Sequence, residues 1–146
     1  MTGRLFAYLQ YLLPRYWMTA LIYRVARVRT NGFKNFLITR FVRQTSLTLE
    51  TNEDEADAVL TARIERYANA PTSVSGEERA ELNRISLSVS VRYMDRVEDK
   101  ELLQRSFQSF EDYNPLDGGL EKEEEAALSA LDNIADDIFT AATSNW

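Results

Sequence analysis

The sequence contains neither cysteine nor histidine. Without cysteine there is no disulfide, thiol nucleophile or thiolate metal site. Without histidine the commonest general base and metal ligand are missing. The five glycines are scattered, so no glycine-rich phosphate loop occurs, and no acidic calcium-loop motif is present. These absences predict a protein that is not an enzyme and that uses no metal or cofactor.

Long uninterrupted apolar segments are also missing from the N-terminal region. Its longest uncharged run, residues 5–14, has ten residues and is followed by Arg15. A membrane-spanning helix needs about 20 predominantly apolar residues. The segment therefore does not predict a transmembrane helix. The chain of 146 residues, 45% of them hydrophobic, has the size and composition of one folded domain.

Acidic residues are absent from the first 49 positions, which carry eight basic side chains. The remaining positions carry 23 acidic and nine basic side chains. From Tyr16 the apolar spacing is helical, with Arg24 and Arg27 beside the apolar face that contains Trp17 and Leu21. This pattern predicts that these four residues contact a membrane surface. A core helix with solvated arginines is the alternative.

Asn31-Gly32 is predicted to interrupt that helix, and a second helix is expected over residues 32–44. We therefore expect a basic amphipathic helical segment at residues 1–31 and an α+β domain at residues 32–146. The segments "LQYLLPRYWMTALIYRVARVR" and "FKNFLITRFVR" resemble the N-terminal membrane-associated region of bacterial phosphatidylserine decarboxylase, over residues 5–43. The resemblance implies membrane contact. The decarboxylase's L-G-S-T self-cleavage motif is absent, so its chemistry is not implied.

Alternation of apolar and polar residues follows, and it predicts strands near residues 45–51, 58–67, 85–94 and 102–110. Helical spacing returns at residues 120–146. The expected fold is an α+β two-layer sandwich, a mainly antiparallel sheet of three to four strands with helices on one face. The helices should cover the side that carries Ile85 and Tyr93. The side with Ser86 and Ser90 should stay wet or meet a partner.

This part also resembles a known family. The segments "FVRQTSLTL", "ARIERYANAPTSV", "NRISLSVSVRYMD", "ELLQRSFQSFEDYN" and "IADDIFTAATSNW" are similar, in this order, to the Bacteroidetes-type lipopolysaccharide-assembly lipoprotein LptE over residues 41–146. The resemblance implies two helices on a mixed four-stranded sheet. It also implies a non-enzymatic role at the periplasmic face of the outer membrane, where the partner is the LptD barrel and the cargo is lipopolysaccharide.

The sequence departs from that family at its start. Members begin with a signal peptide, a lipobox cysteine and a strand before the first helix. Residues 1–40 instead resemble the decarboxylase, so we expect that strand to be missing. The chain reads as a join between two lineages within "RFVRQTS".

Within the LptE hypothesis, four arginines on or near the strands are candidates for lipopolysaccharide or partner contact: Arg63, Arg66, Arg84 and Arg92. Simple solvation of each one is the alternative. A second hypothesis is a peripheral membrane-surface protein that binds anionic lipid through its basic segment. Nucleic-acid binding is not expected, because no reader fold accompanies the basic segment.

Overall fold

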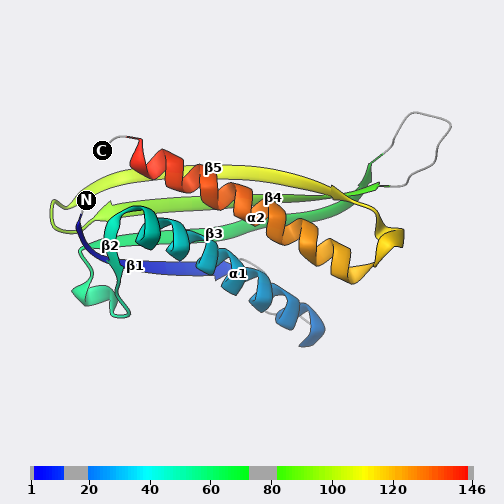
Figure 1. Ribbon diagram of the computed structural model, residues 1–146, viewed down its shortest axis with the longest axis horizontal. Helices are drawn as coiled ribbons and strands as arrows, with labels where there is room; N and C mark the ends of the chain where they lie inside the picture. The colour runs from blue at the N-terminus through cyan, green and yellow to red at the C-terminus, as the bar shows by residue number, and fades with distance from the viewer. Residues whose placement is uncertain (1, 12–19, 73–81, 145–146) are drawn as a thin grey trace.

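A computed structural model describes residues 2–11, 20–72 and 82–144 and shows one sheet with two helices on one of its faces (Figure 1). The strands are β1 (Thr2–Tyr11), β2 (Ser46–Leu49), β3 (Ala58–Thr72), β4 (Leu82–Asp95) and β5 (Lys100–Tyr113). The helices are α1 (Ala20–Gln44) and α2 (Leu120–Thr143), with single 3-10 turns at Glu53–Glu55 and Pro115–Asp117. This confirms the α+β class and the placement of both helices on one face.

The sheet is mixed and has five strands in the order β2-β1-β3-β4-β5. β1 runs parallel to both of its neighbours, whereas β3, β4 and β5 form an antiparallel meander. The register between β3 and β4 shifts between Ile64 and Arg66. An extra residue in one strand reverses the side on which later side chains project. Arg63 and Arg66, three positions apart, therefore lie on the same face of the sheet.

The N-terminal strand β1 corrects two expectations. Residues 2–11 are not helical, and the strand that was expected to be missing is present between β2 and β3. Leu5 and Ala7 are buried towards the helices, while Phe6 and Tyr8 alternate with them on the other face. Because both faces of β1 carry apolar residues, the segment lacks the alternation of apolar and polar residues from which a strand is predicted.

Helix α1 is continuous through Asn31-Gly32, so the expected interruption is also wrong. A side chain at position 32 would place its Cβ 2.8 Å from the Leu128 Cδ2 of α2. Gly32 therefore lets the two helices approach each other. Packing at this contact outweighs the local preference of an Asn-Gly pair for a turn. The same continuity carries α1 across the expected domain boundary between residues 31 and 32.

The core lies between the helices and the sheet. Phe33, Leu37 and Phe41 form the buried stripe of α1 at four-residue spacing. Phe41 packs edge-to-face against Tyr93 of β4 and Phe139 of α2, with ring centroids 5.7 and 5.2 Å away. α2 contributes the buried stripe expected from its sequence, which includes Leu131, Ala135 and Ile138, among others. Helices α1 and α2 and strand β4 thus pack around one aromatic cluster.

No helix within the described ranges is both long enough and apolar enough to cross a membrane.

Candidate functional site

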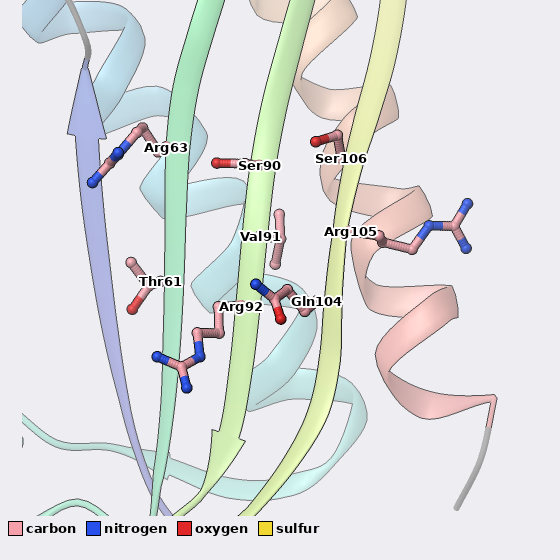
Figure 2. A pocket seen from close by; sticks show the side chains of 8 residues that line it. All are labelled: Thr61, Arg63, Ser90, Val91, Arg92, Gln104, Arg105 and Ser106. Carbon is pink, nitrogen blue, oxygen red and sulfur yellow. The ribbon is translucent and has the colours of Figure 1, made fainter.

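The uncovered face of the sheet is built by alternation along β4. Ile85, Val89 and Tyr93 are fully buried beneath the helices, whereas Ser86 and Ser90 project from the opposite face and are only partly buried. This confirms which side of the strand the helices cover. Neither helix lies on the serine-bearing side, which we call the open face (Figures 1 and 2).

Residues of three strands meet in rows across the open face. In one row, Arg92 of β4 lies between Thr61 of β3 and Gln104 of β5. In the next row, Ser90 lies between Arg63 and Ser106. Directly opposed residues on neighbouring strands are about 5 Å apart, so each row places its three side chains within contact range.

These two rows surround a hollow of about 410 Å³. Its lining consists of Thr61, Arg63, Ser90, Val91, Arg92, Gln104, Arg105 and Ser106. The space exists because serine and threonine are short and the arginines around them are long. Figure 2 shows Arg105 extending away from the other side chains, at the β5 edge of the sheet. We call this feature the polar hollow.

None of the eight residues that line the polar hollow carries a carboxylate. Arg92 Nε lies 2.8 Å from a carboxylate oxygen of Glu101, which stands outside the lining. Both side chains of this pair are more than a third exposed. Exposed ion pairs are weak, because water screens them and two long side chains must be ordered. An incoming anion can therefore compete with Glu101 for Arg92.

Arg84, the other sequence candidate on β4, lies outside the polar hollow. Its guanidinium donates two hydrogen bonds to Asp112, with Nε–Oδ1 and NH2–Oδ2 distances of 2.7 and 2.8 Å. It also stacks 4.2 Å from the centre of the Phe110 ring. The hydrogen bonds from Arg84 hold the pKa of Asp112 below its usual value. Arg84 is thus occupied by protein groups.

Arg66 is exposed in the row beyond the polar hollow, opposite Ser88. The structure therefore brings together two of the four sequence candidates, Arg63 and Arg92, and separates Arg84 from them. Sequence reasoning missed Gln104 and Ser106. The alternation of apolar and polar residues predicted strand β5, which contains both residues. The register that places Gln104 beside Arg92 and Ser106 beside Ser90 depends on how the strands pair in the sheet.

The helix layer contains a second group of charges. Arg29 of α1 is buried and lies 3.0 Å from Glu124 and 3.5 Å from Glu123 of α2. Its guanidinium also stands 4.3 Å from the ring centre of Tyr67, whose hydroxyl donates a hydrogen bond to Glu123. Further along α1, Arg40 is paired with two α2 carboxylates at 2.9 Å each, those of Asp132 and Asp136.

These contacts explain the opposite charges of the two parts of the chain. The numbers of the paired residues rise together along both helices, so α1 and α2 run parallel. At the sheet end, Arg4 of β1 lies within 4 Å of three carboxylates, those of Glu50, Glu55 and Asp57. The basic N-terminal region is therefore attached to the acidic remainder at three places.

The predicted membrane-contact residues fall in a different region. Leu21, Arg24 and Arg27 lie in the first two turns of α1, but their side chains are outside the described part of the structure, as is the whole of Trp17. Membrane contact by these residues stays a prediction. In the residues that the structure describes, no group of three or more acidic side chains is arranged to hold a metal ion.

Comparison with known proteins gives a family match to the N-terminal region. A family model described as PSD matches residues 5–45. This range almost coincides with the residues that resemble the decarboxylase, and it covers less than half of the chain. No curated protein matches the chain.

Solved structures match over nearly the whole chain. A minor lipoprotein from Acinetobacter baumannii is 15% identical, with a TM-score of 0.59 and coverage of 97% of this chain and 93% of that one. A putative lipoprotein from Caulobacter crescentus is 12% identical (TM-score 0.60; 95% and 89% covered). Uncharacterized lipoprotein B from Nitrosomonas europaea is 14% identical (TM-score 0.57; 99% and 86% covered). The chain thus shares its fold with bacterial lipoproteins.

Proposed function

We propose that this protein is a non-enzymatic lipopolysaccharide-assembly protein of the LptE type. In this role it partners an LptD barrel at the periplasmic face of the outer membrane. The observation that carries the proposal is the open face, a sheet surface with arginines on which neither α1 nor α2 lies. Two helices on one side of a mixed sheet are also what the resemblance over residues 41–146 implies. The fold shared with bacterial lipoproteins supports the same class.

The absence of histidine and cysteine supports a binding role over catalysis, because both common nucleophile-base pairs are lost. On the open face, Arg63, Arg66 and Arg92 are the candidate cations for phosphate groups of lipopolysaccharide, and the phosphate would replace Glu101 at Arg92. Arginine suits this task, since its planar fork matches phosphate oxygens. Arg84 is assigned a structural role through its pairing with Asp112.

Co-purification tests the barrel partnership. The chain and its cognate LptD barrel are co-expressed, with an affinity tag on the barrel only. We expect the chain to elute with LptD and not with an unrelated outer-membrane barrel of similar size. A folded variant away from the open face, Arg43→Gln on α1, should still elute with LptD, whereas the core variant Val89→Asp should not, because it disrupts the fold. If the tagged LptD elutes without the unchanged chain as well as without the variants, the proposal is refuted.

A peripheral membrane-surface role is the second candidate. The observation in its favour is the run of 49 residues without a carboxylate, which includes the range matched by the PSD family model. Each Lys or Arg near an anionic surface contributes about 1 kcal/mol of binding free energy. Arg29 and Arg40 already bind α2 carboxylates, so lipid binding would depend on Arg24 and Arg27.

Vesicle flotation tests this candidate. The chain should float with vesicles that contain anionic lipid and stay in solution with neutral ones. The double variant Arg24→Gln with Arg27→Gln should float less. The double variant Lys34→Gln with Arg43→Gln, which removes two exposed cations of α1, serves as the charge-matched control. Equal flotation of both variants would remove the basic segment as the lipid-binding element.

A further inference from the structure

Strand β5 forms one edge of the sheet, and its outer side pairs with no other strand in the part of the chain that the structure describes (Figure 1). This edge is 14 residues long and contains no proline, whereas β2, at the opposite edge, has four residues. An unpaired edge presents a row of backbone N–H and C=O groups that can pair with another strand. The β5 edge is therefore the longer of the two places where a further strand can be added.

A bulge limits the regular part of this edge. The pairing with β4 shifts between Tyr93 and Met94, because Leu102 is an extra residue of β5. Residues 103–113 then pair with β4 without a further shift. These eleven residues alternate regularly between the two faces of the sheet, and Gln108 is their midpoint.

Two charged side chains of this regular part, Arg105 and Glu111, form no ion pair with any residue that the structure describes. Glu111 accepts hydrogen bonds from two neutral groups, Ser129 Oγ and Asn133 Nδ2, at 3.2 Å each. The Arg105 guanidinium stands 4.8 Å from the ring centre of Phe107 and is exposed. Figure 2 shows its side chain extending outward past β5, away from β4. A cation and an anion on the same strand are thus both available to a neighbour.

The positions of these two charges are symmetric about the midpoint of the strand. Arg105 and Glu111 lie opposite Val91 and Ile85 of β4, which face the helices, so both are on the helix side of the sheet. Arg105 comes three residues before Gln108, and Glu111 comes three residues after it. If a second β5 pairs antiparallel with the two Gln108 residues opposed, each Arg105 lies opposite Glu111 of the other copy. Opposed residues of opposite charge stabilise an antiparallel pair.

Other registers of the same pairing fit less well. A register centred one residue away pairs nine of the eleven residues and places Glu111 opposite Leu103 or Phe107. A register centred on Arg105 opposes two like charges, which is destabilising. A register centred between two residues places helix-side residues opposite open-face residues. The register centred on Gln108 pairs the whole regular part and matches both charges.

We propose that β5 pairs along its outer edge with β5 of a second copy of this chain, antiparallel and centred on Gln108, in a two-fold symmetric dimer. The two five-stranded sheets then form one continuous sheet, with both open faces on the same side. The assembly is closed, because each copy uses its long edge and only the four-residue β2 edges remain. This dimer does not require a barrel partner, so it goes beyond the proposed function.

Sedimentation of the purified full chain over a series of concentrations tests the dimer. We expect a reversible equilibrium between monomer and dimer. Arg105→Glu should weaken the dimer by about tenfold or more, because the two-fold axis places the repulsive pair twice. The double variant Arg105→Glu with Glu111→Arg should recover most of that loss, since the opposed charges are exchanged and match again. Lys100→Glu makes the same change of charge outside residues 103–113 and should dimerise like the unchanged chain. Thermal unfolding of each variant shows whether the fold is retained.

Crosslinking tests the register. The chain has no cysteine, so one introduced thiol reports on one position. In Gln108→Cys the two thiols face each other across the axis, about 5 Å apart at their Cβ atoms, which is close enough for a disulfide after a small adjustment. Gln104→Cys lies on the same side of the same strand, but its counterpart in the other copy is about 26 Å away. Mild oxidation should yield covalent dimers of Gln108→Cys and leave Gln104→Cys monomeric on a non-reducing gel.

Three outcomes would overturn the proposed dimer. A monomer at every concentration would mean that β5 does not pair with itself, and that a strand of another protein is the remaining occupant of the edge. A charge-exchanged double variant no better than Arg105→Glu would mean that these two residues do not meet. Equal crosslinking of the two cysteine variants would mean association through another surface. These measurements use the purified chain alone, so the dimer and the partnership with LptD can fail separately.

Discussion

The two faces of the sheet arise from alternate residues of the same strands. Along β4, Val89 is fully buried against the helices, and its neighbour Ser90 projects into the polar hollow on the open face. The helix side is filled by aliphatic and aromatic groups around Phe41, and the open side carries arginines, serines and Gln104 beside the exposed aromatic residues Tyr8 and Phe110. Stability therefore depends on one face, while the other is available for binding.

The helix side has one polar exception, which sharpens the contrast. Arg29 is buried, but three neighbouring groups from β3 and α2 satisfy it, namely Glu123, Glu124 and the Tyr67 ring. Arg84 on the open face has a comparably good partner in Asp112 but stays 41% exposed. The same residue type is thus buried and paired on one side of the sheet and partly hydrated on the other.

The largest expected effect comes from placing a charge on the buried face. Val89→Asp should lower the free energy of unfolding by at least about 4 kcal/mol, because the carboxylate would be buried without a partner. Ser90→Asp, one residue along on the open face, should change it by no more than about 0.5 kcal/mol. Urea denaturation of both variants measures the difference. Similar losses would contradict the assignment of the two faces.

Removing arginine from each face gives the next largest difference. Arg29→Ala should lower the free energy of unfolding by about 2–3 kcal/mol, since it leaves the partly buried carboxylates of Glu123 and Glu124 without their cation and removes side-chain volume between α1 and α2. Arg84→Ala should cost much less, because its ion pair is solvated. Urea denaturation compares the two variants. A loss for Arg29→Ala as small as the loss for Arg84→Ala would show that the ion pairs on the helix side are not needed for α1 to pack against α2.

The smallest expected effect concerns pH and the open face. The Arg84 hydrogen bonds lower the pKa of Asp112 from its ordinary 3.8. A carboxylate with a lowered pKa in the folded state stabilises the protein above its unfolded pKa, and this contribution is lost as the pH falls through the lower folded value. Asp112→Asn should therefore flatten the decline of stability below about pH 3.8, measured by urea denaturation at several pH values. An unchanged decline would mean that Asp112 and Arg84 do not interact in solution.

The sequence alone predicted the features that depend on local period. The alternation of Ile85 to Tyr93 identified the buried and open sides of β4, and the apolar stripe of α2 identified its packing face. Charges were placed correctly on strands, as with Arg63 and Arg92, but the sequence could not say which of the arginines share a site.

What the tertiary structure decided are the contacts between residues distant in the sequence. β1 shows no alternation of apolar and polar residues, because the aromatic residues Phe6 and Tyr8 alternate with Leu5 and Ala7, and its place in the sheet is set by pairing with β2 and β3. Asn31-Gly32 continues a helix because Leu128 packs against Gly32. The eight cations of the first 49 residues could have faced a membrane, and three of them instead bind carboxylates of later segments. The periodicity of apolar residues along a segment indicates whether one of its faces is buried. Partners and strand register depend on packing between segments, and the polar hollow follows from that register.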